Sequence, residues 1–332
     1  MNGVRVEVLR GARVESIHVV DLAVLGTGGE VLVTSGDAAS PVFARSALKP
    51  FQAIPLVEDG VVERFGLTDE ELALCCASHS GEPRHVQLAA SILARIALGE
   101  DALACGPHVP FDDAAAGALR AAGREPGRLH NNCSGKHAGM LALAAAHGWQ
   151  TEGYHLPEHP VQRRMMEEAC RWGGVEAEGV WTGADGCGVV TFGLPLTALA
   201  RAFARLVAAE PGSPGARVVA AMTGHPFLVG GTDRLCTRLM EVTSGRVLAK
   251  VGAEGVYGAA SREGGVGVAL KARDGARRAA EAALPGVLEA LDLLRPGEVE
   301  ALEPWGRQTL RNTRGERVGE VRAAVELGAR RG

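Results

Sequence analysis

The pattern of apolar and polar residues differs between the two ends of the chain and its middle. Near both ends, short segments alternate or run apolar between Gly-rich turns, which is typical of strands joined by tight connections. These predicted strands are residues 4–9, 17–24, 30–34, 246–250, 255–257 and 265–271. Apolar residues at helical spacing then predict a helix over residues 275–294.

The middle of the chain is rich in Ala and Leu, and its apolar residues recur at helical spacing. The predicted helices are residues 70–76, 84–98, 113–122, 139–147, 160–172 and 196–209. We therefore predict an α+β fold, in which both chain ends build an antiparallel sheet and a mainly helical region is inserted between them. The sheet domain would contain residues 1–40 and 225–332 and the helical region residues 41–224, with the active site at their junction.

The composition of the 332 residues is that of an ordinary soluble globular protein, with 46% hydrophobic and 22% charged residues. A net charge of -4 and an aromatic share of 4% give no reason to expect a nucleic-acid partner. Because we find neither a signal-peptide core nor a membrane-length apolar run, we expect a cytoplasmic location without a membrane partner. Seven cysteines, an odd number, favour free thiols or metal ligands over a disulfide framework.

Lysine is scarce in this chain, although Lys and Arg together number 35. The four lysines are Lys49, Lys136, Lys250 and Lys271. A lysine in such a chain can mark a site that needs an amine able to lose its proton, which a guanidinium does not do in proteins. The first three of them lie in short polar segments embedded among small residues, and these segments are the candidates for chemistry.

Ser46 and Lys49 form the first candidate pair. Their spacing places both side chains on one face of a helical turn, and Pro50 predicts that this turn begins a helix. An amine beside a serine hydroxyl can take its proton and generate an acyl-transfer nucleophile, provided that burial or a neighbouring cation lowers the pKa of the amine. The alternative is a solvated lysine at a helix N-terminus, because the spacing S-x-x-K also occurs by chance.

Two further segments could complete such a site. In C-A-S-H-S-G-E, Ser78 or Ser80 could be a nucleophile with His79 as general base, although a helix cap or turn explains the same residues. The segment K-V-G begins at Lys250 and is similar to the K-T-G element of serine β-lactamases and penicillin-binding proteins, with Val251 in place of threonine.

A group of sulfur and nitrogen atoms is also predicted. Cys133, Lys136 and His137 lie together after a pair of asparagines, and Cys187 lies in a Gly-flanked loop. Two thiolates and a nitrogen could hold a zinc ion, whereas two buried free cysteines are the alternative. Asp185, in the same loop as Cys187, could receive a substrate ammonium group or could be an ordinary turn residue.

Five segments in this order resemble the bacterial L-asparaginase II family of the rhizobial, thermolabile type. They are R-S-A-L-K-P-F-Q-A, C-A-S-H-S-G-E, H-N-N-C-S-G-K-H-A-G, G-A-D-G-C-G and K-V-G-A-E-G-V. The third is far more specific than S-x-x-K, and the resemblance covers nearly the whole chain. It implies a fold like that of glutaminases and serine β-lactamases, a homodimer, and hydrolysis of asparagine to aspartate and ammonia.

The resemblance also implies two Ser-Lys pairs, which are Ser46 with Lys49 and Ser78 with Lys250. Of the two serines, we favour Ser46 as the nucleophile because its lysine is three residues away. The second pair would then act as a proton relay for the leaving ammonia and the hydrolytic water.

The family's zinc ion is bound by two cysteines and a lysine, which match Cys133, Lys136 and Cys187. This ion is expected to support substrate binding and not to activate the attacking water. Arg45 and Asp185 match segments that line the family's substrate site. Asp185 would hold the α-ammonium group of asparagine, and Arg45 or Lys136 would face its α-carboxylate.

Three other functions stay open from the sequence. They are a glutamine-directed amidase, a penicillin-recognising hydrolase or peptidase with the same Ser-Lys chemistry, and a non-catalytic protein that binds zinc or an amino acid. Turnover of nitrocefin would support the penicillin-recognising enzyme. The non-catalytic protein predicts that Ser46→Ala leaves all behaviour intact.

Overall fold

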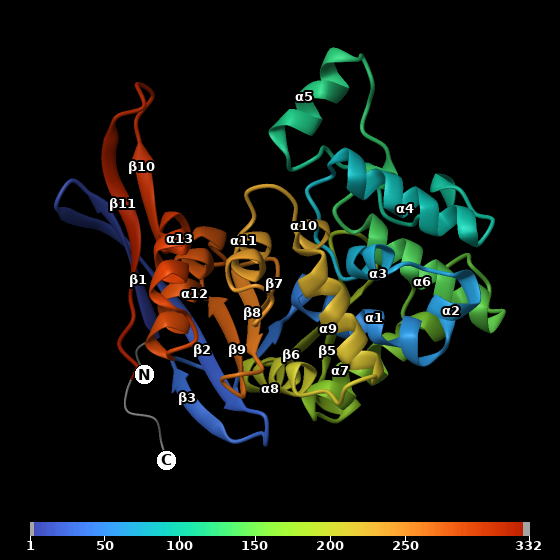
Figure 1. Cartoon of the computed structure of the whole chain (residues 1–332), viewed down its shortest axis with the longest axis horizontal. Coiled ribbons are helices and arrows are strands. Elements are labelled where there is room, and N and C mark those ends of the chain that lie inside the picture. Colours follow the sequence, from blue (N-terminus) through green and yellow to red (C-terminus); the bar gives the residue numbers. More distant parts are fainter. Residues whose placement is uncertain (1–2, 328–332) are drawn as a thin grey trace. The chain divides into compact units, whose positions relative to one another are not determined.

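The computed structural model describes residues 3–327, and these residues form two compact units. The first, called the sheet unit here, contains the described chain up to Ala47, Gly193–Ala208, and the described chain from Arg238 onward. The second, the helical unit, contains Leu48–Phe192 and Ala209–Thr237 (Figure 1). Both ends of the described chain therefore belong to the same unit.

The sheet unit is built on an eight-stranded antiparallel sheet. Its strand order is β10-β11-β1-β2-β9-β8-β7, and β3 pairs with β2 beside this path. The strands are β1 Val4–Arg10, β2 Arg13–Gly26, β3 Val31–Ser35, β7 Val247–Val251, β8 Val256–Ser261, β9 Val266–Ala272, β10 Arg307–Arg311 and β11 Arg317–Ala324. Three strands precede the helical insertion and five follow it, which confirms the predicted α+β class with an antiparallel sheet from both chain ends.

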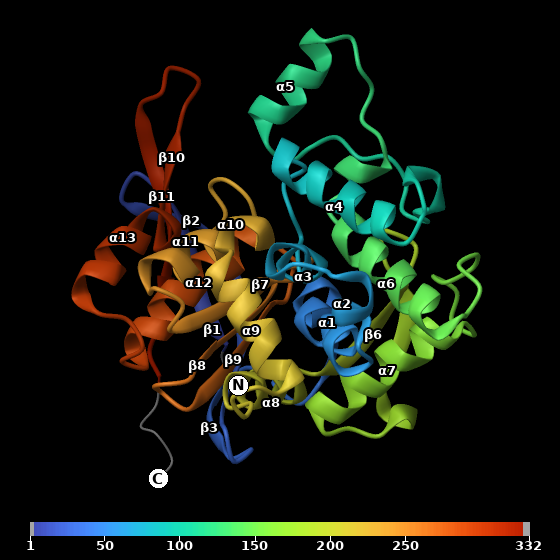
Figure 2. The ribbon, with the colours of Figure 1, turned by 45° about the vertical axis from the view of Figure 1, so that its right-hand side comes forward.

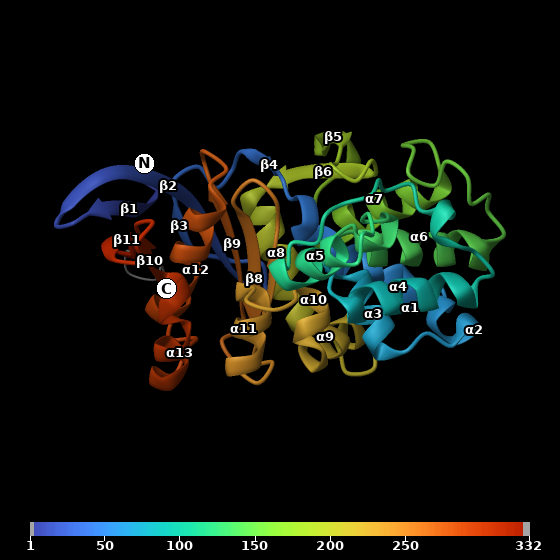
Figure 3. The same ribbon diagram turned by 90° about the horizontal axis from the view of Figure 1, so that it is seen from above.

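Three helices belong wholly to the sheet unit, and two of them pack directly on the sheet: α8 on β9, β2 and β8, and α12 on β11, β9, β2 and β8 (Figure 3). The helices are α8 Leu196–Val207, α12 Arg277–Ala290 and α13 Pro296–Gly306. A Cβ on Gly267 would lie 2.1 Å from the carbonyl oxygen of Ala200, so glycine lets α8 approach β9 closely. The sequence pattern placed α8 in the helical region of residues 41–224, but its apolar face is buried on these strands.

The helical unit is organised around α6, against which α1, α3, α4 and α7 pack (Figure 2). Its helices are α1 Lys49–Glu58, α2 Val61–Phe65, α3 Asp69–Cys75, α4 Pro83–Arg95, α5 Asp113–Ala121, α6 Ser134–His147, α7 Pro160–Gly173, α9 Pro214–Gly224 and α10 Pro226–Val229. Every residue of α6 from Ser134 to Ala144 is buried, which is typical of a helix that is covered on all sides.

Four elements complete the description. Strands β4 Pro41–Phe43 and β6 Val190–Pro195 pair antiparallel, with Phe43 opposite Gly193, and β5 spans Trp181–Ala184. Helix α11 spans Leu235–Val242, and the boundary between the two units falls within it, after Thr237. Among residues 3–327, no helix has both the length and the apolar character needed to cross a membrane.

Candidate active site

The polar segment around Cys133 forms the beginning of helix α6. The side-chain oxygen of Asn131 accepts a hydrogen bond from the backbone N–H of Cys133 at 2.9 Å, which fixes the turn that leads into the helix. A Cβ on Gly135 would lie 2.4 Å from the carbonyl oxygen of Leu74, so only glycine allows α6 to approach α3 this closely. The beginning of α6 therefore lies against the end of α3, from which the chain continues to Ser78.

Lys49 is the first residue of α1 and is only 1% exposed. Its Nζ lies 2.6 Å from the carbonyl oxygen of Ala77, 3.0 Å from Ser78 Oγ and 3.2 Å from Cys133 Sγ. Pro50 follows in the first turn, where its missing N–H leaves no helical hydrogen bond unmade, as the sequence predicts. The structure thus brings Lys49 and Ser78 into direct contact inside the helical unit.

The partners of Lys49 suit both of its protonation states. As an ammonium group, Nζ has three hydrogens and can donate to all three partners. As an uncharged amine it has two hydrogens and one lone pair. Because the carbonyl oxygen of Ala77 can only accept, the amine would donate to Ala77 and Cys133 and accept the hydroxyl hydrogen of Ser78. A proton can therefore pass between Ser78 and Lys49 without any rearrangement of the side chains.

The other members of the predicted Ser-Lys pairs lie in the sheet unit. Ser46 is 9% exposed and lies in the 3-10 turn Arg45–Leu48, which runs directly into α1. Arg45 has a φ of 51°, in the left-handed region that is strained for a residue with a side chain, and such strain is often found at functional sites. Lys250 lies in edge strand β7, is 0% exposed, and donates from Nζ to the carbonyl oxygen of Val251 at 2.9 Å.

Cys133, Lys136 and Cys187 come together in the helical unit. Lys136 Nζ lies 3.2 Å from Cys187 Sγ, and the Cys133 thiol donates a hydrogen bond to Cys187. This hydrogen bond lowers the pKa of Cys187 and raises the pKa of Cys133, so one proton is held between the two sulfurs. Burial alone would lower the pKa of Lys136, but the two cysteines, with Asp185, outweigh burial and raise it. The directions of these pKa shifts favour a thiolate at Cys187 beside an ammonium group at Lys136.

Hydrogen bonds connect the predicted catalytic and sulfur groups into one buried chain. The chain runs from Ser78 through Lys49 to Cys133, and from there through Cys187 to Lys136. Within residues 3–327, no cluster of three or more His, Cys, Asp or Glu could hold a metal ion. The predicted zinc ligands Cys133, Lys136 and Cys187 lie together at this site, with Cys187 in contact with each of the other two.

Asp185, the predicted partner of a substrate ammonium group, lies in the turn before Cys187. Its Oδ1 accepts a hydrogen bond from the backbone N–H of Gly186 at 2.8 Å, and the carboxylate is partly exposed. Its charge is among those that raise the pKa of Lys136, which places Asp185 near the end of the buried chain.

His79 has a structural place beside Ser78 and Ser80. Its Nδ1 accepts a hydrogen bond from the backbone N–H of Gly81 at 3.1 Å, so Nε2 carries the hydrogen and donates to Ser134 Oγ at 2.9 Å. Burial lowers the pKa of His79 well below its usual range. Since the acceptor nitrogen is occupied and the ring is neutral, His79 fixes the beginning of α6 and is not placed to act as a general base.

Tyr154 is a member of this region that the sequence analysis missed. It is buried, and its hydroxyl lies 2.9 Å from the backbone nitrogen of Ala104 and 2.5 Å from His137 Nδ1. Burial, followed by the charge of Lys136, lowers the pKa of His137 to about 3. The sequence gives only a weak indication that Tyr154 belongs to the site. It is one of only two tyrosines in the chain, but it lies outside every polar motif.

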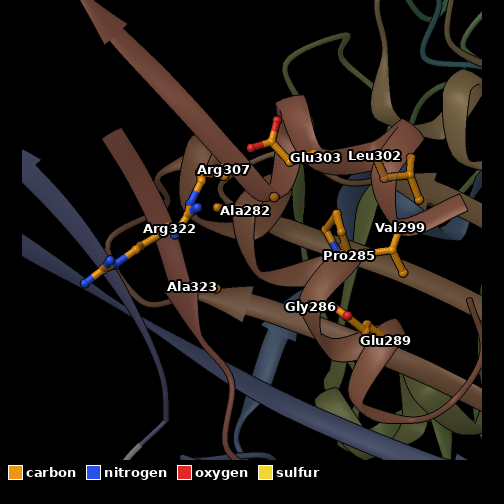
Figure 4. Close-up of a pocket in the computed structure, with 11 residues that line it drawn as sticks. Ala282, Pro285, Gly286, Glu289, Val299, Leu302, Glu303, Arg307, Arg322 and Ala323 are labelled. Atoms are coloured by element: carbon orange, nitrogen blue, oxygen red, sulfur yellow. The ribbon is translucent and has the colours of Figure 1, made fainter. Parts of the chain in front are cut away.

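A separate pocket of about 260 Å³ lies in the sheet unit, beside α12, α13, β10 and β11 (Figure 4). Its polar lining includes Arg307 and Arg322, and Arg322 is paired with Glu7 at 3.2 Å. None of the residues predicted for catalysis, substrate binding or metal binding lines this pocket.

Comparison with known proteins identifies the family. Residues 6–323 match the L-asparaginase II family, so the chain belongs to that family. The protein is accordingly a hydrolase of the asparaginase type. Among curated proteins, no match is found. Among solved structures, the chain is similar to a crystal structure described as a beta-lactamase from Mycobacterium bovis, with 19% identity, a TM-score of 0.44, and coverage of 82% of this chain and 94% of that chain.

Proposed function

We propose that the protein hydrolyses L-asparagine to L-aspartate and ammonia through a serine activated by Lys49. The observation that carries this proposal is the buried contact of 3.0 Å between Lys49 Nζ and Ser78 Oγ, which joins the proposed base of Ser46 to the second serine of the proposed relay. Membership of the L-asparaginase II family supports the choice of substrate. An amine held against a hydroxyl away from water is one arrangement that can activate a serine for acyl transfer.

In the first half of the reaction, Ser46 Oγ attacks the side-chain amide carbon of asparagine and loses its proton to Lys49. Backbone N–H groups stabilise the oxyanion that forms. The carbon–nitrogen bond then breaks, and the departing nitrogen receives a proton, so that ammonia leaves and an ester with Ser46 remains. The relay that delivers this proton consists of Ser78 and Lys250. Ser78 is also in contact with Lys49.

In the second half, a water molecule attacks the ester carbon and gives its proton to the same relay. The bond to Ser46 Oγ breaks, the serine recovers its proton, and aspartate is released. Asp185 pairs with the α-ammonium group of the substrate, while Arg45 supplies positive charge for the α-carboxylate, as does Lys136 when it is protonated and holds no metal.

The proposed activity is tested with the purified protein in two assays. The first follows ammonia release from asparagine, glutamine and 3-aminopropanamide, and the second follows nitrocefin turnover. We expect asparagine to be preferred over glutamine by about 10- to 200-fold in kcat/KM, since that is the usual discrimination for one methylene group. Nitrocefin should not be turned over. Preferential release from glutamine would make the protein a glutaminase, and binding without any turnover would favour a non-catalytic amino-acid-binding protein.

We also propose that Cys133, Lys136 and Cys187 hold a zinc ion. Sulfur and nitrogen are donors that zinc prefers, and three protein ligands leave a fourth position open. Because ligands must be deprotonated, binding has to release the protons held on Cys133 and Lys136. When bound, zinc would supply a positive charge beside the substrate site.

The zinc proposal predicts a loss of affinity when a donor is removed. Cys187→Ser and Lys136→Met should weaken zinc binding by more than the roughly 10- to 100-fold typical of groups that only orient a ligand. Competition with a chromophoric chelator measures this affinity directly. Cys170→Ser is the matched control, because Cys170 is a half-buried free cysteine on α7 outside the donor set. Equal zinc affinity in all four proteins would exclude the site.

A further inference from the structure

His137 is a buried histidine whose two nitrogens differ in their surroundings. It is the fourth residue of α6 and is 0% exposed. Its Nδ1 lies 2.5 Å from the hydroxyl of Tyr154, which lies 2.9 Å from the backbone nitrogen of Ala104. Its Nε2 is buried and has no hydrogen-bond partner among the described residues. Unpaired polar atoms of this kind are rare in folded proteins and often mark a missing ligand or water.

The hydrogen bonds around Tyr154 assign the hydrogen on the His137 ring. The backbone N–H of Ala104 can only donate, so Tyr154 Oη accepts from it and has its own hydrogen to give. If that hydrogen goes to His137 Nδ1, a single N–H at Nε2 is left without a partner. The opposite assignment would leave both the tyrosine hydrogen and the Nε2 lone pair unpaired. The network therefore makes Nε2 a hydrogen-bond donor that needs an acceptor.

The charges near His137 indicate what kind of acceptor is missing. Side chains in a helix incline toward its N-terminus, so the ring of His137 covers the first turn of α6, beginning at Cys133. Lys136 and Lys49 both lie close enough for their charges to lower the pKa of this ring, and Cys133 acts on it in the opposite direction. The N-terminal end of a helix carries the positive end of its dipole. An N–H donor at this end of the helix, beside the ammonium group of Lys136, suits an anionic oxygen.

We propose that Nε2 of His137 donates a hydrogen bond to the α-carboxylate of the bound amino acid. This inference rests on the proposed function, because it assigns a further substrate-binding residue to the same site. Tyr154 acts on the substrate only through His137, by holding the ring in the tautomer that can donate. This role explains why His137 and Tyr154 are buried inside the helical unit although Nε2 of His137 has no hydrogen-bond partner among the described residues.

The test compares ligands that differ only in the α-carboxylate. 3-Aminopropanamide is asparagine without that group, and β-alanine is aspartate without it. His137→Leu should lower kcat/KM for asparagine by about 10- to 100-fold, mainly through KM, because it removes a hydrogen bond to a charged group. Activity on 3-aminopropanamide should change by less than about threefold, and His137→Gln, which retains an N–H donor, should recover part of the loss.

His85→Leu is the matched control, because His85 is also 0% exposed but both of its nitrogens have partners. Its Nδ1 accepts from the backbone N–H of Glu82 at 3.2 Å, and its Nε2 contacts the carbonyl oxygen of Phe227 at 3.1 Å. His85→Leu should change kcat/KM by the same factor for asparagine and for 3-aminopropanamide. Equal losses on both substrates in His137→Leu would overturn the proposal and indicate that Nε2 bonds only a buried water.

Binding measurements separate this inference from the proposed reaction. In calorimetry, wild type should bind aspartate more tightly than β-alanine, and His137→Leu should remove most of that difference even if asparagine is not hydrolysed. If the variant does not fold, side-chain nitrogen NMR of wild type decides: aspartate, but not β-alanine, should shift the Nε2–H resonance of His137. An unshifted resonance in the presence of saturating aspartate would refute the contact.

Discussion

Replacing Lys49 by arginine should lower kcat for asparagine by a factor of about 10² to 10⁴, the range over which a positioned general base contributes. Arginine keeps the positive charge but cannot release its proton to serve as a base. The amine of Lys49 is 1% exposed and contacts Ser78 Oγ at 3.0 Å, so water cannot easily replace it. The expected result is a folded protein that still binds aspartate but hydrolyses asparagine very slowly.

The matched control is Lys271→Arg, because Lys271 is a half-buried lysine outside the proposed site. Its Nζ donates to the carbonyl oxygen of Glu254 at 2.8 Å. Steady-state ammonia release and a thermal melt should be recorded for both variants, since the larger guanidinium can strain a packed site by about 1–3 kcal/mol. If Lys49→Arg melts close to wild type and retains near-normal turnover, Lys49 is not the base.

The architecture was largely predictable, because most elements bury one face and therefore carry a periodic apolar pattern. All six predicted strands are present, and α12 lies within the predicted helix of residues 275–294. Strands β10 and β11 were missed because their apolar pattern is weak, and β10 is an edge strand of the sheet. Strand β10 has no buried residue, and β11 buries only Gly319, Glu320 and Val321, so neither strand carries a strong apolar signal.

The beginning of α6 was missed for the opposite reason. The sequence predicts a helix only from residue 139, whereas the helix begins at Ser134. Its first turn contains Ser, Gly, Lys and His, which are typical of a loop, yet every one of these residues is buried. Local helix propensity does not predict this turn, because its residue types suit packing against α3 and the contacts of the polar site.

The motifs contained the residues of the proposed site but not their contacts. Spacing along the chain suggested Ser46 as the partner of Lys49, and the structure places Ser78 Oγ on Lys49 Nζ. That contact joins residues 29 positions apart, so no local pattern could predict it. The link from Lys49 to Cys133 spans 84 positions and connects the predicted catalytic pair to the predicted metal ligands.

Ser46→Ala and Ser78→Ala should each lower kcat by about 10³-fold or more, because members of one catalytic unit fail together when any of them is lost. Turnover alone therefore cannot say which serine forms the ester. A diazoketone analogue of asparagine, which alkylates an activated serine, can do so when the labelled peptide is identified by mass spectrometry. We expect the label on Ser46 in wild type.

The variants make this assignment decisive. Ser78→Ala should label more slowly than wild type but still on Ser46, whereas Ser46→Ala should not label at all. Ser80→Ala should label at the normal rate, because the Ser80 hydroxyl is 3.0 Å from the carbonyl oxygen of Gly230 and has no place in the proposed relay. A label on Ser78 would exchange the roles of the two serines, and the contact between Ser78 and Lys49 would then mark the nucleophile itself.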